Sequence, residues 1–255
     1  MDLHIKDKII LVTGGARGIG AAITKLLAAE GAIPVVVGRN EKDNKNIIEE
    51  AGAGFPVSAE LTRPEECRLA VETAIRQFGR LDGLVNNAGI NDGVGLLNGD
   101  YESFMASLHK NLVHYFLVAH YALPELIKSR GSIVNIGSKV ADTGQGNTSA
   151  YAASNGGRNA LTREWAVELL PYGIRVNAVI VAECYTPLYE KWIQTLPDPE
   201  SRLRSITEKI PLGKRMTTAE EIAAMVVFLL SEKSSHTTGQ LIHVDGGYTH
   251  LDRSI

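Results

Sequence analysis

The stretch Ile9-Ile10-Leu11-Val12-Thr13-Gly14-Gly15-Ala16-Arg17-Gly18-Ile19-Gly20 joins a short apolar run to a cluster of glycines. A helix-compatible run, residues 21–30, follows directly. A strand, a tight glycine turn and a helix in this order are typical of a dinucleotide site, because bare backbone lets a pyrophosphate reach the free N–H groups of the helix N-terminus. The spacing is Gly-x-x-x-Gly-x-Gly rather than the commoner Gly-x-Gly-x-x-Gly. A nucleotide site is therefore predicted, with a purely structural glycine turn as the alternative.

The composition of the chain limits the kinds of protein that it can be. With 255 residues, 44% of them hydrophobic, the chain can bury a core as one α/β domain or two small ones. A net charge of −3 gives no argument for binding nucleic acid or an anionic membrane. The apolar runs are too short to span a bilayer, and residues 1–7 lack the apolar core of a signal peptide. We therefore expect a cytoplasmic protein with no nucleic-acid or membrane partner.

The spacing of cysteines and histidines predicts neither a disulfide framework nor a metal site. Cys67 and Cys184 are the two cysteines, and they lie far apart in the chain. His109, His114 and His120 lie near one another, but none of these pairs has the i, i+4 spacing that would place two ligands on one helix face. Solvated or packed histidines are the expected outcome.

Apolar runs alternate with helical patterns along the whole chain. Strands that read as unbroken apolar runs are buried on both faces, which predicts a parallel sheet covered by helices. Right-handed crossovers then give an α/β fold with a single Rossmann-type doubly wound sheet of seven parallel strands flanked by helices, and residues 1–255 form one domain. The expected strands are residues 9–12, 33–37, 54–58, 81–85, 132–136, 174–180 and 240–244, and the expected helices are residues 21–30, 41–51, 64–78, 101–128, 150–170 and 219–230.

The longest insertion between sheet elements is residues 181–218. In an open α/β sheet this segment would lie over the carboxyl ends of the strands, where ligands bind. We expect a lid that covers the substrate, with a surface helical hairpin as the alternative.

The end of the second strand favours NADP over NAD. Sites that select NAD usually place an acid there for the ribose 2′-hydroxyl, and sites for NADP place a base for the 2′-phosphate. The strand ends in Gly38-Arg39-Asn40, with no carboxylate before Glu41, and Arg17 in the glycine turn could face the same pocket. Two guanidinium groups suit a phosphate. NAD remains possible if both arginines are solvated.

Several later motifs, together with the glycine turn, resemble those of the short-chain dehydrogenases/reductases. Residues 13–20 look like the cofactor motif of that family, and residues 86–89, Asn-Asn-Ala-Gly, look like its NNAG motif. Ser138 and Tyr151 match its catalytic serine and tyrosine, and Asn111 falls where it has a catalytic asparagine. The resemblance covers essentially the whole chain and implies an NAD(P)-dependent oxidoreductase.

The resemblance also implies which residues hold the cofactor. Glu60-Leu61 stands where the family usually has Asp-Val beside adenine, and Thr186 matches a threonine on the nicotinamide side. The residues expected to bind the cofactor are Gly14, Arg17, Gly18, Ile19, Gly20, Arg39, Glu60, Leu61, Asn87, Ala88, Gly89, Tyr151, Asn155 and Thr186.

The sequence departs from the family pattern at a position that bears on catalysis. The family has Tyr-x-x-x-Lys, whereas this chain has Tyr151-Ala-Ala-Ser-Asn155, and Val181-Ala182 replaces a Pro-Gly pair after the sixth strand. A tyrosine, whose ordinary pKa is about 10, works as an acid/base near neutral pH when a cation stabilises its phenolate. Asn155 keeps the location and could hydrogen-bond a ribose hydroxyl, but it lacks the charge.

Three interpretations of Asn155 follow. The enzyme could work with a higher pH optimum, or another cation could replace the lysine. Candidates are Arg158, on the same helix face as Tyr151, and Lys139, next to Ser138. Alternatively, the protein binds the cofactor but catalyses poorly, as a sensor or scaffold would. Ser138, Tyr151, Asn155 and Asn111 are the expected catalytic residues.

The loops that face the substrate carry many hydrogen-bonding groups. Among them Asn91, Gln145, Glu183 and Trp192 are the expected substrate contacts, and an aromatic ring can stack on a sugar face. Residues 182–189 look similar to the corresponding run of aldose dehydrogenases of the L-fucose type. This favours oxidation of a sugar hemiacetal, such as L-fucose, to its lactone. Reduction of a steroid or a 3-oxoacyl-type ketone is the alternative, since a mostly apolar pocket would suit those substrates.

The resemblance further implies a homotetramer. Helices 101–128 and 150–170 correspond to those that pair between subunits in the family, and they carry Tyr115, Phe116 and Trp165. These aromatic residues lie either on exposed faces or, alternatively, in the core.

Overall fold

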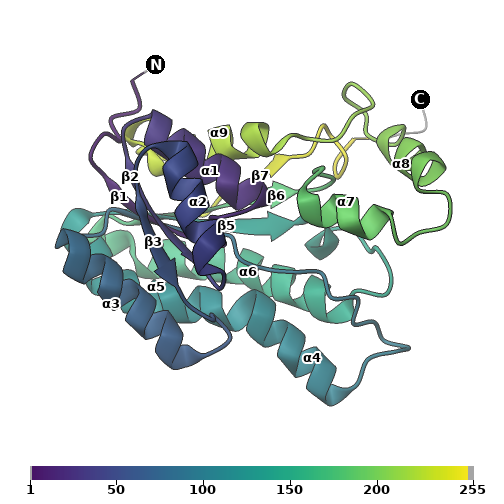
Figure 1. The fold of residues 1–255 in the computed structure, drawn as a ribbon, viewed down its shortest axis with the longest axis horizontal. Coiled ribbons are helices and arrows are strands. Elements are labelled where there is room, and N and C mark those ends of the chain that lie inside the picture. Colours follow the sequence, from purple (N-terminus) through teal and green to yellow (C-terminus); the bar gives the residue numbers. More distant parts are fainter. Residues whose placement is uncertain (1, 252–255) are drawn as a thin grey trace.

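The computed structural model describes residues 2–251 and has an α/β fold built on one parallel sheet. The sheet of the described residues has seven strands in the order β3-β2-β1-β4-β5-β6-β7 (Figure 1). The predicted fold class is therefore confirmed. The strands are β1 (Ile9–Thr13), β2 (Ile33–Gly38), β3 (Phe55–Ser58), β4 (Gly83–Asn86), β5 (Ser132–Ser138), β6 (Arg175–Val181) and β7 (Leu241–Val244).

Helices cover both faces of this sheet. One hydrophobic cluster packs α1 and α9 against one face, and a second cluster packs α3, α5 and α6 against the other (Figure 1). The helices are α1 (Gly18–Ala29), α2 (Glu41–Ala51), α3 (Pro64–Phe78), α4 (Tyr101–Leu108), α5 (His114–Ser129), α6 (Ser149–Glu168), α7 (Pro187–Ile193), α8 (Pro199–Thr207) and α9 (Ala219–Leu230).

The unbroken apolar sequence of strand β1 follows from its position between two layers of helices. Successive side chains of a strand point to opposite faces. Ile9 and Leu11 accordingly belong to the cluster with α3 and α5, whereas Ile10 and Val12 belong to the cluster with α1 and α9. Because both faces are covered, neither set of positions can be polar.

The predicted single helix over residues 101–128 is wrong in one respect. A π-helical turn, His109–Val113, separates α4 from α5, and it contains Asn111. Such a turn inserts an extra residue into an α-helix and is frequent at functional sites. Pro124 lies inside α5, which continues to Ser129.

Two of the three aromatic residues considered for exposed helix faces are in the core. Tyr115 is fully buried and Trp165 nearly so, whereas Phe116 is half exposed. Tyr115 and Trp165 belong to the cluster that packs α5 and α6 on the sheet, so their faces are the inner faces of those helices.

No helix among residues 2–251 combines the length and the apolar character that crossing a membrane requires.

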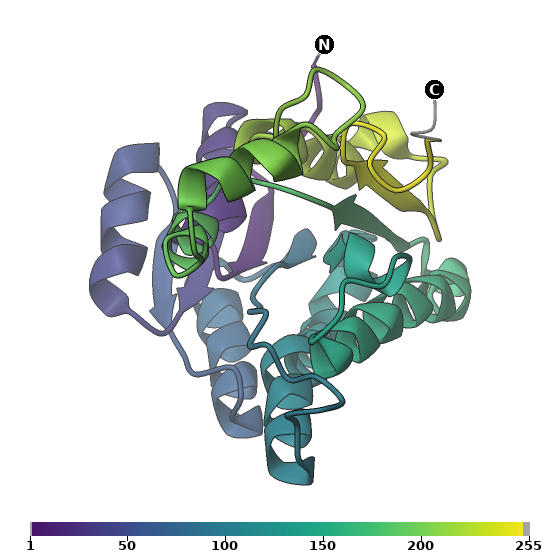
Figure 2. The same ribbon diagram turned by 90° about the vertical axis from the view of Figure 1, so that its right-hand side faces the viewer.

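The insertion after β6 lies at the carboxyl edge of the sheet. Figure 2 faces this edge and shows α7 and α8 in front of the strands. Cys184 forms a parallel bridge with Thr217, and the Leu212 N–H donates to the Gly246 carbonyl at 3.0 Å. Both ends of the insertion are thus tied to the chain around β6 and β7.

Replacing Leu11 with alanine should lower the free energy of unfolding by about 3 kcal/mol, because removal of a fully buried side chain on an interior strand leaves a cavity. Urea denaturation measures this. The control is Leu97→Ala, since Leu97 is 95% exposed and its truncation should change stability by no more than about 0.5 kcal/mol. Equal losses for the two variants would contradict the described core.

Candidate active site

A groove of about 1710 Å³ runs along the carboxyl edge of the sheet. It begins at the end of β2, passes the glycine turn before α1 and the loop after β4, and reaches the end of β5, α6 and the start of α7. This is the edge at which open α/β sheets bind ligands. Its length and its mixed lining suit an extended molecule with both charged and apolar parts.

The glycine turn leaves a cradle of bare backbone. A Cβ at Gly20 would lie 2.1 Å from the Gly14 carbonyl oxygen, so no side chain fits there. Gly14 and Gly18 have φ values of +64° and +54°, which favour glycine. No side chain caps the N-terminus of α1, so its first N–H groups stay available. These features fit the pyrophosphate of a dinucleotide.

The Asn86-Asn87 pair fixes this cradle from behind. The Asn87 side chain donates to the carbonyls of Thr13 and Gly14 at 2.9 and 3.2 Å, while the Thr13 hydroxyl accepts the N–H groups of Asn87 and Ala88. Asn86 donates to Asn135 on β5 at 3.0 Å. The two amides therefore join the loop after β4 to both neighbouring strands.

Acidic partners pair with the two arginines proposed for NADP. Arg17 pairs with Asp43 at 2.7 Å and Arg39 with Glu60 at 3.5 Å. Burial would raise the pKa of Glu60, but hydrogen bonds from Thr62 and the nearby Arg39 hold it below its usual value. Both arginine side chains are mostly exposed, at 64% and 78%, so these pairs contribute little and can exchange for another anion.

Ser138 and Tyr151 both line the other end of the groove. Ser138 is the last residue of β5 and Tyr151 lies in the first turn of α6. The strand and the helix thus bring a hydroxyl and a phenol to one wall of the groove.

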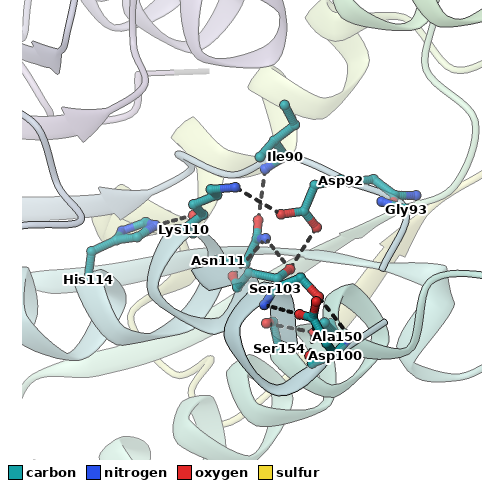
Figure 3. Close-up of polar contacts among 12 residues, drawn as sticks. Ile90, Asp92, Gly93, Asp100, Ser103, Lys110, Asn111, His114, Ala150 and Ser154 are labelled. Carbon is teal, nitrogen blue, oxygen red and sulfur yellow. Dashed lines mark hydrogen bonds and ion pairs between the residues drawn. The ribbon is translucent and has the colours of Figure 1, made fainter. Parts of the chain in front are cut away.

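Asn111 lies behind that wall rather than in it. Its side-chain oxygen accepts the Ile90 N–H at 2.8 Å and its amide donates to the Ser107 carbonyl at 3.0 Å (Figure 3). Asp92 and Lys110, which pair at 3.3 Å beside it, line the groove. Asn111 is fully buried and ties the loop after β4 to the π-helical turn.

Asn155 is also fully buried, and its amide bridges two neighbours. The Asn155 NH₂ donates to the Tyr151 carbonyl at 2.9 Å, and its oxygen accepts from the Arg158 guanidinium at 3.1 Å. Arg158 also donates to the carbonyls of Asn111 at 2.6 Å and Ile136 at 3.1 Å. The cation that follows Tyr151 on α6 therefore lies at position i+7 rather than i+4.

Lys139, the other cation considered, is already neutralised. Its ammonium pairs with Glu183 and lies 3.9 Å from the centre of the Tyr248 ring. Of the predicted substrate residues, Glu183 is thus held in an ion pair with Lys139. Trp192 packs edge-on against Tyr189, with their ring centres 5.1 Å apart.

Most of the predicted cofactor residues share the groove. The lining includes Gly14, Arg17, Gly18, Ile19, Arg39, Glu60, Leu61, Asn87, Ala88, Gly89, Tyr151 and Thr186. It does not include Gly20, Asn155 and Asn111, nor the predicted substrate residues Asn91, Gln145, Glu183 and Trp192.

Several residues in the lining were not expected from the sequence. They include Lys110 and His114, whereas Asp92 and Tyr189 lie in stretches that were expected to face the substrate. Lys110 lies in the π-helical turn and His114 follows it, and no sequence pattern indicated this turn.

Comparisons with known proteins agree with this geometry. A family model described as enoyl-(acyl carrier protein) reductase matches residues 14–249. The chain is 38% identical to the 3-oxoacyl-[acyl-carrier-protein] reductase FabG of Thermotoga maritima, over 96% of this chain and 99% of that one. The chain belongs to the short-chain dehydrogenase/reductase family.

Two further relatives of this family are close. An L-fucose dehydrogenase of Bos taurus is 37% identical, over 97% of this chain and 91% of its own length. The crystal structure of Cj0485 dehydrogenase matches with a TM-score of 0.96 and 44% identity, over 100% of this chain and 99% of that chain. The resemblance to short-chain dehydrogenases/reductases, including L-fucose dehydrogenases, is therefore confirmed.

His114 should make the stability of this family member depend on pH. Burial, with the charge of Arg158, lowers its pKa from 6.5 to about 4, and its ring bonds the Lys110 carbonyl at 2.9 Å (Figure 3). Between these pH values the unfolded chain binds the extra proton, so stability falls as the pH drops through this window. At pH 5 the loss attributable to His114 should be about 2 kcal/mol.

His114→Gln should remove this part of the pH dependence while keeping an N–H donor for the Lys110 carbonyl. Urea denaturation of both proteins at pH 5 and pH 8 measures it. If the free energy of unfolding differs between pH 5 and pH 8 by the same amount in His114→Gln as in the wild type, His114 does not cause the pH dependence.

Proposed function

We propose that the chain oxidises a secondary alcohol or a sugar hemiacetal with NADP, or with NAD as the less favoured cofactor, and that an L-fucose-like aldose is the substrate. The observation that carries the proposal is the joint placement of Ser138 and Tyr151 on a groove that begins in a dinucleotide cradle. Tyr189 lines the groove as well, and the Lys139–Glu183 ion pair lies next to it in the chain, beside Ser138 and Ala182; we take this combination to favour a polyhydroxylated substrate.

The chain's own residues can supply the proton chemistry. A nicotinamide, when bound, supplies the hydride acceptor. The Ser138 hydroxyl would donate a hydrogen bond to the substrate oxygen and so orient it. The Tyr151 phenolate would accept the proton of the hydroxyl group that is oxidised. Thr186 stands opposite Gly18, since a Cβ at that glycine would lie 3.4 Å from the Thr186 Cβ, and it would border the nicotinamide end.

One lining residue, Tyr189, and three residues that lie outside the lining, Lys139, Glu183 and Trp192, support a sugar. Lys139 and Glu183 form a nearly buried ion pair, and its members can donate and accept hydrogen bonds. Burial, and next the charge of Glu183, raise the pKa of the Tyr189 hydroxyl, which lines the groove. Tyr189 also packs against Trp192. Aromatic faces next to paired charges suit the apolar face and the hydroxyl groups of a pyranose ring.

A second candidate is reduction of a 3-oxoacyl-type ketone. The similarity to a 3-oxoacyl-[acyl-carrier-protein] reductase favours it, as does an exposed leucine on the groove. Leu188 lines the groove and is 53% exposed.

We further propose that residues 181–218 act as a lid and that the protein forms a homotetramer in the cytoplasm.

Turnover on an aldose panel tests the proposed substrate class. L-Fucose and related aldoses should be oxidised with NADP⁺, and Tyr151→Phe should lower kcat at least about 100-fold because the proton acceptor is lost. Estradiol and a 3-oxoacyl thioester serve as the alternative substrates. Preference for either of these would overturn the sugar proposal. Tight NADP(H) binding without turnover on any of them would instead indicate a binding protein.

Arg39→Ala tests the cofactor. The KM for NADP⁺ should rise about tenfold while the KM for NAD⁺ changes little, because only NADP⁺ carries a 2′-phosphate. The matched control is Arg63→Ala, an exposed arginine that pairs with Glu66 and does not line the groove. Equal effects of Arg39→Ala on both cofactors would remove the argument for NADP.

A further inference from the structure

We propose that Arg158 is the positioning residue whose positive charge holds Tyr151 as a phenolate, in place of a cation at residue 155. The inference rests on the proposed function, because it assigns a partner to the phenol that accepts the proton. Arg158 lies about one helical turn after residue 155 on α6, where the family pattern has a lysine and this chain has none.

The Arg158 guanidinium is buried without an acidic partner. The residue is 3% exposed, and no carboxylate of residues 2–251 forms an ion pair with it. Its N–H groups donate to neutral acceptors, which are the carbonyls of Asn111 and Ile136 and the side-chain oxygens of Asn155 and Asn111. Guanidinium groups stay protonated in proteins, so a full charge remains uncompensated at this point.

That charge lies next to the phenol. The central guanidinium carbon is 6.0 Å from the centre of the Tyr151 ring and 4.2 Å from the centre of the Tyr115 ring. Both Arg158 and Tyr151 line the groove. Since charges interact more strongly away from water, a cation at this distance favours the phenolate over the neutral phenol.

The surroundings of Arg158 keep it in this place. A Cβ at Gly89 would come within 2.9 Å of both the Arg158 Nη2 and the Asn111 side-chain oxygen, so the absence of a side chain there makes room for the guanidinium. The Asn155 amide links the Tyr151 carbonyl to the guanidinium and adds no charge. A lysine at residue 155 would place a second cation against the first.

Two other cations near this end of the groove have acidic partners, and a third, Lys191 on α7, is exposed to solvent. Lys139 pairs with Glu183, and Lys110 pairs with Asp92 at 3.3 Å and is partly exposed. The influence of Arg158 also reaches a second titratable group, since its charge adds to burial in lowering the pKa of His114.

Two substitutions separate charge from structure. Arg158→Gln keeps hydrogen-bond donors and removes the charge, whereas Arg158→Lys keeps the charge. We expect Arg158→Gln to lower kcat at neutral pH at least about tenfold and to move the rise of kcat with pH towards alkaline values. Arg158→Lys should retain most of the turnover and the wild-type pH profile. The matched control is Arg163→Gln, an exposed arginine on the same helix, which should leave both unchanged.

Asn155→Lys supplies a second, independent arm. Alone it should lower turnover, because two cations would be adjacent, but in combination with Arg158→Gln it should restore kcat and the pH profile. Such a rescue cannot arise from a merely structural role of Arg158. If Arg158→Gln does not fold, the role of Arg158 is tested with Arg158→Lys and with the double variant that combines Asn155→Lys and Arg158→Gln.

A readout without turnover keeps this inference separable from the proposed function. The absorbance of ionised tyrosine is recorded as a function of pH for the wild type and for Tyr151→Phe. The difference between the two curves is the contribution of Tyr151. Arg158→Gln should move that contribution to higher pH. If the Tyr151 absorbance change occurs at the same pH in Arg158→Gln as in the wild type, the role of Arg158 is overturned. Equal losses of kcat in Arg158→Gln and Arg158→Lys would overturn it as well. If no substrate is turned over but the contribution moves, the proposed function fails and the role of Arg158 stands.

Discussion

The Arg158 guanidinium joins the three elements that carry the reacting end of the groove. It binds the carbonyl of Asn111 in the π-helical turn, the carbonyl of Ile136 on β5 and the amide of Asn155 on α6. β5 ends in Ser138 and α6 begins with Tyr151 in its first turn, so this buried side chain helps to fix the relative position of hydroxyl and phenol. The π-helical turn, which adds a residue between α4 and α5, brings the Asn111 carbonyl to it.

The parallel sheet explains why these groups meet at one edge. Every strand of the described sheet runs in the same direction, so the turns after β1, β2, β4 and β5 all open at their carboxyl ends. The glycine cradle follows β1 and the exposed Arg39 pair follows β2, whereas Ser138 ends β5. A dinucleotide laid across this edge would therefore have its adenosine near β2 and its reacting end near β5.

Local sequence patterns predicted the fold, whereas the details of the site depend on contacts between distant segments. The apolar strands and the glycine turn are local signals, and all seven strands were found within a few residues of their bounds. Arg158, by contrast, bonds residues 47 and 22 positions away, and Lys139 and Glu183 are 44 positions apart. The sequence could name both cations near Tyr151, but only the tertiary structure shows that Glu183 neutralises Lys139 and that no acid among residues 2–251 neutralises Arg158. The π-helical turn has no periodic signal of its own and was missed.

The uneven distribution of charge along the groove is itself an argument for chemistry at the β5 end. At the β2 end each arginine is exposed and has an acid beside it, an arrangement that is nearly neutral in its effect on stability. At the β5 end a buried cation has only neutral acceptors, and burying such a charge opposes folding. An apolar side chain of similar volume would serve the packing of α6 better. The proposed role of Arg158 would account for this cost, because Tyr151, with its ring centre 6.0 Å away, is a group beside it on the groove that can become an anion.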